Sequence, residues 1–174
     1  MIRALRIALV LVTVVPSLAG QQRAPSFLAE DGDAAKLDTL HLQARIDGEV
    51  HVGDDGRGVV TLSVAPKAKM HVYAADAEGY VPFTLRVEPP AAVTPGRVTY
   101  PTAELSVFPP TGESSRVYSK PFKVTQAFVL TPAARKTLAA SGTVQGVAQL
   151  RYQACDDHVC YRPATGTLSF EIVR

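Results

Sequence analysis

Short runs in which apolar and polar residues alternate recur along this chain, and they limit its fold more than any other feature. Period-two alternation is typical of β-strands with one buried face, and 13 prolines and 12 glycines supply frequent turns between the runs. The predicted strands are Leu40–Ile46, Val60–Val64, Met70–Tyr73, Phe83–Val87, Phe122–Leu130, Val147–Ala154 and Thr167–Val173. Short strands at this spacing predict an all-β fold, and specifically a β-sandwich.

One segment has a helical pattern instead. Thr131 suits an N-cap, Pro132 suits the first helical position, and Gly142 suits the carboxyl end. We therefore expect at most one short helix. No internal repeat or second domain is visible, so residues 37–174 are predicted to form one domain after a flexible leader at residues 21–36.

The amino terminus has the layout of a secretory signal peptide. Arg3 and Arg6 precede a short apolar run that ends in the small residues Ser17-Leu18-Ala19. The run is shorter than the roughly 20 apolar residues that span a bilayer, although a retained membrane anchor is the alternative. We expect residues 1–20 to be removed, which leaves a soluble, exported protein without stable membrane insertion.

The charge balance argues against nucleic acid and anionic membranes as partners. Loss of Arg3 and Arg6 would take the basic residues from 18 to 16, which equals the 16 acidic residues. A neutral chain has no electrostatic attraction for polyanions. The chain also lacks tryptophan, so no stacking platform for bases or sugars is evident.

The only two cysteines, Cys155 and Cys160, are separated by four residues where one predicted strand ends and a turn leads to the last. In an exported protein such a pair is usually oxidised. A structural disulfide is one interpretation, but a six-residue loop contributes only about 2 kcal/mol, against about 4 to 5 kcal/mol for a loop spanning the domain. Redox exchange is the second, because one thiolate can attack a disulfide and its neighbour can resolve the product.

A metal site is the third interpretation of this segment. Cys155, His158 and Cys160 are close in sequence, but nothing places a fourth ligand beside them, so we expect no metal. The local charges act in opposite directions: Asp156 and Asp157 disfavour a thiolate, whereas a protonated His158 favours one. The spacing alone does not decide between a structural and a redox-active pair.

The stretch around the cysteines resembles the N-terminal periplasmic domain of the DsbD thiol:disulfide interchange protein family. The matching motif is Tyr152-Gln153-Ala154-Cys155, an aspartate directly after it, and then Cys160-Tyr161 and Pro163. Residues 69–74 and 79–82 also resemble an earlier strand and turn of that family. The resemblance covers Leu37–Val173.

The resemblance implies an immunoglobulin-like β-sandwich that needs no cofactor and carries electrons from a membrane thiol relay to periplasmic thioredoxin-like proteins. In the family's manner, Cys160 would form the mixed disulfide with partners and Cys155 would resolve it, as in a thiol–disulfide oxidoreductase of the protein-disulfide reductase type. The expected shielding or tuning residues are Val117, Tyr118, Tyr152, Asp157, His158 and Tyr161.

Three departures from the family pattern affect these expectations. Val117 stands in the expected cap loop, near residues 114–119, where the family often has a bulky aromatic shield, so Tyr118 is an alternative shield. Arg162 replaces a common proline. The chain ends at Arg174 without a membrane relay or thioredoxin domain, so we expect both as separate proteins.

The rival function is a non-catalytic exported interaction module with a structural disulfide.

Overall fold

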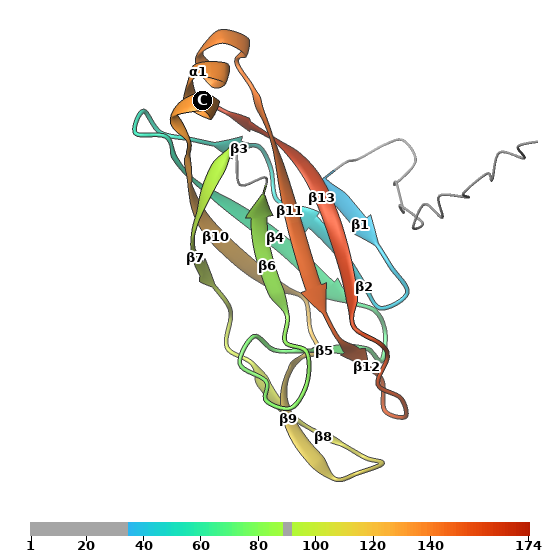
Figure 1. Cartoon of the computed structure of the whole chain (residues 1–174). Helices are drawn as coiled ribbons and strands as arrows, with labels where there is room; N and C mark the ends of the chain where they lie inside the picture. The colour runs from blue at the N-terminus through green and yellow to red at the C-terminus, as the bar shows by residue number, and fades with distance from the viewer. Residues whose placement is uncertain (1–34, 89–91) are drawn as a thin grey trace, which may run out of the picture.

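The computed structural model describes residues 35–88 and 92–174, and nearly all of its regular structure is β (Figure 1). The elements are β1 (Lys36–Asp38), β2 (Leu42–Ile46), β3 (Val50–His51), β4 (Arg57–Pro66), β5 (His71–Tyr73), β6 (Thr84–Glu88), β7 (Val93–Thr99), β8 (Glu104–Phe108), β9 (Glu113–Tyr118), β10 (Phe122–Leu130), α1 (Pro132–Ser141), β11 (Val144–Tyr152), β12 (Ala154–Cys155) and β13 (Ala164–Val173). The predicted signal peptide, and all of the predicted leader before residue 35, lie outside the described residues.

The strands form three sheets. The first has the order β1-β2-β4-β10-β7, the second β3-β13-β11-β6, and the third β12-β5-β9-β8. The first two pack face to face, and the third lies at the end of the molecule opposite α1 (Figure 1). This arrangement confirms the predicted immunoglobulin-like β-sandwich with one short helix.

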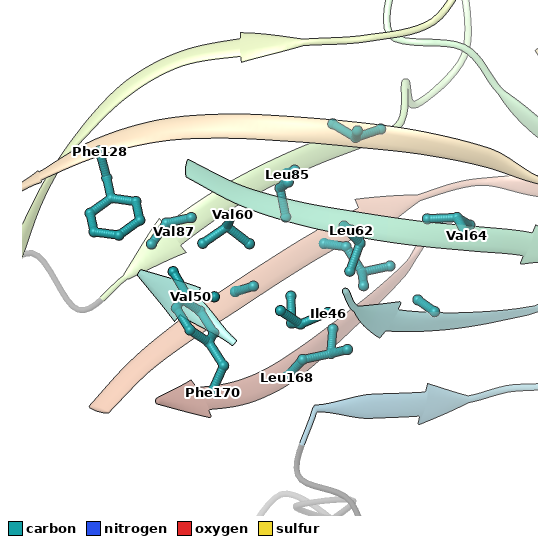
Figure 2. Packing of buried hydrophobic residues seen from close by; sticks show 14 of the residues in the cluster. Ile46, Val50, Val60, Leu62, Val64, Leu85, Val87, Phe128, Leu168 and Phe170 are labelled. Atoms are coloured by element: carbon teal, nitrogen blue, oxygen red, sulfur yellow. The ribbon is translucent and has the colours of Figure 1, made fainter. Parts of the chain in front are cut away.

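The core lies between the first two sheets because their strands alternate in burial. In β4, Val60, Leu62 and Val64 are buried while the residues between them face outward. Figure 2 shows these side chains gathered with others from the second sheet, including Leu85 of β6 and Leu168 of β13. Burial of such side chains is the main stabilising contribution to the fold.

A buried polar side chain also joins the two sheets. Gln126 of β10 is 3% exposed, and its Oε1 accepts a hydrogen bond of 2.8 Å from the backbone N–H of Val87 in β6. A buried amide with a partner avoids the cost of an unsatisfied polar group. The bond also fixes how β6 sits against β10.

The helix begins and ends as predicted. The Thr131 hydroxyl accepts a hydrogen bond from the Ala134 N–H, Pro132 opens the helix, and Gly142 adopts a φ of 81° at its end. This left-handed conformation favours glycine, which has no Cβ. Ala134 and Leu138 are the helix residues that pack into the core.

A predicted strand and a predicted loop differ from the structure. The first predicted strand began two residues too early: Leu40 is 85% exposed, and β2 starts at Leu42 after a turn. Residues 114–119 were expected to be a cap loop, but 114–118 belong to β9, which pairs with β8 on one side and β5 on the other. A local hairpin with β8 and pairing with the distant β5 make this segment a strand.

Candidate functional site

The two cysteines form a disulfide across a tight hairpin at the third-sheet end of the molecule. Cys155 and Cys160 face each other as an antiparallel bridge with a Cα–Cα distance of 4.1 Å. Hydrogen bonds flank them on both sides, from Asp156 N–H to the Val159 carbonyl and from Tyr161 N–H to the Ala154 carbonyl. The cysteines therefore occupy a non-hydrogen-bonded pair, where side chains on opposite strands come closest.

Asp156 shapes the turn between the cysteines. Its Oδ1 accepts hydrogen bonds from the backbone N–H groups of His158 (2.8 Å) and Val159 (2.7 Å), and its Oδ2 accepts one of 2.9 Å from the Tyr161 hydroxyl. These donors hold the pKa of the Asp156 carboxyl below its ordinary value, with the His158 N–H as the largest cause. From the sequence Asp156 was expected to act only through its charge, although an aspartate that opens a turn commonly accepts hydrogen bonds from the backbone.

The two sulfur-bearing residues differ in exposure. Cys155 is 0% exposed and lies in β12, paired with His71 of β5. Cys160 is partly exposed and follows Val159, whose side chain is 51% exposed. A thiol or thiolate from another molecule therefore has easier access to Cys160.

A buried tyrosine contacts both sulfurs. The Tyr73 hydroxyl oxygen lies 3.2 Å from Cys155 Sγ and 3.3 Å from Cys160 Sγ, and Tyr73 is only 1% exposed. Burial raises the pKa of its hydroxyl well above the ordinary value. We did not predict a role for Tyr73, because the contact joins residues far apart in sequence and has no local signal.

Tyr73 is covered by a second tyrosine from the segment that links β5 and β6. The rings of Tyr73 and Tyr80 stack with centroids 4.0 Å apart and an interplanar angle of 8°. The Tyr80 hydroxyl donates a hydrogen bond of 2.6 Å to Glu113 Oε2 at the start of β9. Neither Tyr80 nor Glu113 was predicted to have a role, and their bond joins the β5–β6 segment to β9 next to the cluster of Tyr73, Val117 and Cys155.

Val117 and Tyr118 of β9 have different surroundings. Val117 is buried in a small cluster with Tyr73 and Cys155, against which Cys160 and Tyr80 also pack. Tyr118 belongs to the main core instead, with its ring 4.3 Å from that of Phe122. The structure thus brings Val117, and not Tyr118, to the disulfide.

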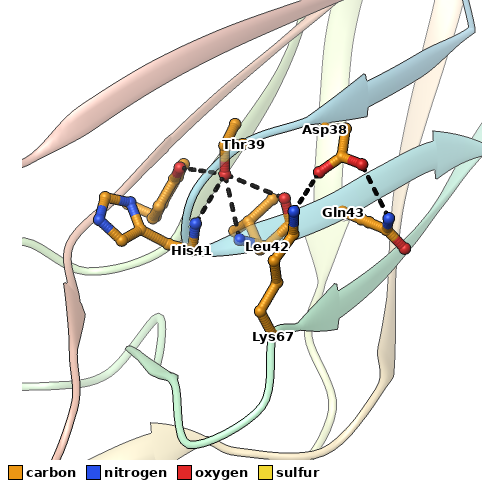
Figure 3. A network of polar contacts seen from close by, with 7 residues as sticks. Asp38, Thr39, His41, Leu42, Gln43 and Lys67 are labelled. Atoms are coloured by element: carbon orange, nitrogen blue, oxygen red, sulfur yellow. Dashed lines mark hydrogen bonds and ion pairs between the residues drawn. The ribbon is translucent and has the colours of Figure 1, made fainter.

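Tyr152 and Tyr161 flank the hairpin on its other side, around His41. The His41 ring lies 6.1 Å from the Tyr152 ring and 4.6 Å from the Tyr161 ring. The Tyr152 hydroxyl is hydrogen-bonded to Thr39 Oγ1 at 3.0 Å. Figure 3 shows that Thr39 also bonds the backbone of His41 and Leu42, so this network anchors the strand beside the hairpin.

The remaining predicted tuning residues, Asp157 and His158, are exposed in the turn. His71 lies nearer the pair in the sheet, and burial lowers the pKa of its imidazole.

Within residues 35–88 and 92–174, no cluster of three or more His, Cys, Asp or Glu side chains could hold a metal ion. In the same part of the chain, no helix has the length and hydropathy needed to span a bilayer.

Comparison with a solved structure agrees with this fold. The chain is similar to the crystal structure of the N-terminal periplasmic domain of ScsB from Proteus mirabilis, with 17% identity and a TM-score of 0.55 over 79% of this chain and 50% of that one. It thus spans about half of that structure. It is also similar to the reduced DsbD N-terminal domain of Neisseria meningitidis, with 20% identity and a TM-score of 0.40 over 74% of this chain and 85% of that one.

Sequence comparison identifies the family. No curated protein sequence matches this chain. A family profile described as "Thiol:disulfide interchange protein DsbD, N-terminal" matches residues 38–172, more than half of the chain and the whole hairpin with Cys155 and Cys160. The chain belongs to the DsbD N-terminal domain family.

Proposed function

We propose that this chain is a periplasmic domain that exchanges its Cys155–Cys160 disulfide with thiols of other proteins. The observation that carries the proposal is the asymmetric disulfide: Cys155 is fully buried, and Cys160 is partly exposed beside an exposed valine. Membership of the DsbD N-terminal domain family supports the same function. Its proposed partners are a membrane thiol relay and periplasmic thioredoxin-like proteins.

Reduction of the chain begins at Cys160. A thiolate of the relay attacks Cys160 Sγ, the Cys155–Cys160 bond breaks, and its electron pair leaves on Cys155 Sγ as a thiolate. The second thiolate of the relay then attacks the relay sulfur that is bonded to Cys160 Sγ, which forms the disulfide of the relay and releases Cys160 as a thiolate. Two electrons have moved to the chain, and the relay has become a disulfide.

Delivery of the electrons reverses these steps. The Cys160 thiolate attacks the disulfide of an oxidised thioredoxin-like protein and forms a mixed disulfide, releasing the first thiol of that partner. Cys155 then attacks Cys160 Sγ, which re-forms the original disulfide and releases the second thiol. Cys155 is suited to this resolving role because it is buried beside Cys160 and protected from other thiols.

The cover over the pair limits exchange with unintended thiols. Tyr80 and Val117 pack against the cluster that contains the cysteines, and Glu113 holds the Tyr80 hydroxyl. A partner that displaces this cover would gain fuller access to Cys160, which is already partly exposed. In this proposal Tyr80 is the aromatic shield, a role for which Tyr118 was the alternative expected from the sequence.

Trapping tests the exchange function and the two cysteine roles. Cys155→Ser leaves Cys160 able to form a mixed disulfide that no second thiol of this chain can resolve. We expect this variant to capture an oxidised thioredoxin-like partner as an adduct that dithiothreitol releases, and Cys160→Ser to capture far less. Electrophoresis without reducing agent measures both.

Equal capture by the two variants would keep the exchange function and remove the assignment of roles. Capture by neither, together with a reduction potential below about −300 mV, would favour the structural disulfide of a non-catalytic module.

The periplasmic location has its own test, since mass spectrometry of the native protein should find an amino terminus near Gly20 or Gln21. An intact Met1 in a membrane fraction would contradict it.

A further inference from the structure

The hydroxyl of Tyr73 is placed to act on both sulfurs of the pair. Its oxygen lies almost equally far from them, 3.2 Å from Cys155 Sγ and 3.3 Å from Cys160 Sγ. The sulfurs of a disulfide carry no proton, so only the hydroxyl can donate in these contacts, to one sulfur at a time. The Tyr80 hydroxyl is a further acceptor for the same proton. The Tyr73 hydroxyl can follow the negative charge to either sulfur when the bond between them breaks.

The Tyr73 ring is held in this position from two sides. One face stacks on Tyr80, whose own hydroxyl is engaged by Glu113. Tyr73 also belongs to the buried cluster with Val117 and Cys155. A donor fixed in advance stabilises developing charge without reorganising during the reaction.

The surroundings make such a donor useful. A buried thiolate is disfavoured by loss of solvent, and the carboxylates of Asp156 and Asp157 in the adjoining turn disfavour it further. His71 lies across the strand pair from Cys155, but burial lowers its pKa and so favours its neutral form near pH 7. The raised pKa of Tyr73 keeps its proton in place, so the hydroxyl can donate throughout.

We propose that Tyr73 is a catalytic residue whose hydroxyl donates a hydrogen bond to the thiolate released at each step of disulfide exchange. The inference rests on the exchange function proposed above. When an incoming thiolate bonds to Cys160 Sγ, the electron pair of the broken bond goes to Cys155 Sγ, and the Tyr73 hydroxyl, 3.2 Å away, turns its proton to that sulfur. When Cys160 is released in turn, the hydroxyl turns its proton to Cys160 Sγ, 3.3 Å away. Tyr73 keeps its proton, and solvent protonates the released thiolates.

Tyr73→Phe tests the proposal because it removes the hydroxyl and keeps the ring that stacks on Tyr80. The first measurement is the rate at which dithiothreitol reduces the oxidised protein near pH 7. The second is the pKa of the Cys160 thiol, taken from the pH dependence of iodoacetamide alkylation in a Cys155→Ala background. Loss of the hydrogen bond to a charged sulfur should slow reduction about tenfold and raise the pKa of the Cys160 thiol by about one unit.

Tyr100→Phe is the matched control. Tyr100 is half-buried, and its hydroxyl accepts a hydrogen bond of 3.4 Å from the Leu85 N–H in a different part of the fold. We expect Tyr73→Phe to slow reduction and raise the thiol pKa, and Tyr100→Phe to change neither. Circular dichroism of each variant shows that the fold is intact.

An unchanged reduction rate or an unchanged thiol pKa in folded Tyr73→Phe would overturn the proposal and leave Tyr73 as a packing residue. Capture of a partner by Cys155→Ser does not require this hydroxyl, so it tests the exchange function separately. Capture without a Tyr73 effect removes only the role of Tyr73. No capture removes the exchange function and the role of Tyr73 with it.

Discussion

Neighbouring residues of a strand point to opposite faces of the sheet, and this geometry assigns different roles to two adjacent residues of β9. Val117 contacts the cluster around the disulfide, whereas Tyr118 packs in the main core and its hydroxyl donates to the Pro101 carbonyl. The aromatic cover comes instead from Tyr80, in another segment. The surroundings of this disulfide therefore combine the buried Val117 with the partly exposed ring of Tyr80.

Tyr80→Ala should expose Cys160. An aromatic pair contributes about 1 kcal/mol beyond its buried area, so losing the stack on Tyr73 should speed alkylation of reduced Cys160 about fivefold. The measurement uses iodoacetamide at a pH above the thiol pKa, where the reaction reports access and not thiolate formation. Tyr80→Phe keeps the stack and should give a smaller increase. Equal rates in wild type and Tyr80→Ala would show that Tyr80 does not cover the site.

The hairpin between β12 and β13 is the element that presents the disulfide, and Asp156 orders its turn. Asp156→Ala should increase amide hydrogen exchange at His158 and Val159 about fivefold, because each N–H loses a hydrogen bond worth about 1 kcal/mol. Asp157→Ala is the control, since Asp157 is exposed and these N–H bonds go to Asp156. Unchanged exchange in Asp156→Ala would remove this role of Asp156.

The same turn predicts a pH dependence. The pKa of Asp156 is lowered from its ordinary 3.8 in the folded chain, chiefly by the His158 N–H, so folding favours the ionised carboxylate. Its contribution is fully present above the unfolded pKa and is lost as the pH falls through the folded pKa. The exchange difference between wild type and Asp156→Ala should therefore persist at pH 5 and disappear only below 3.8. Disappearance above pH 4 would contradict the assigned direction.

For the whole molecule, the disulfide should matter little to folding. It closes only a local hairpin, which contributes about 2 kcal/mol, while the core between the two large sheets remains. The reduced protein should keep its β-type circular dichroism, and denaturant unfolding should show a loss of about 2 kcal/mol, matched by Cys155→Ala/Cys160→Ala. Loss of the β signal on reduction would mean that the disulfide holds the fold together, which would oppose a domain that works in both redox states.

The strands and the helix with strong local patterns were predictable from the sequence. The alternation from Phe122 to Leu130 matches β10, and Thr131, Pro132 and Gly142 delimit α1 because capping depends on residues within one turn. The cysteine hairpin was also predictable, since its spacing and turn residues are local. These features depend on the chain within a few residues of each position.

Only the tertiary structure decided several strands and the surroundings of the disulfide. The edge strands β7 and β8 are largely exposed, and the internal strand β9 is buried only at its end, so burial patterns in the sequence do not identify them and pairing with neighbouring strands forms them. The contact of Tyr73 with the sulfurs likewise spans 82 and 87 residues. A local pattern sets which face of a strand is buried, but what that face contacts depends on which distant strand packs against it.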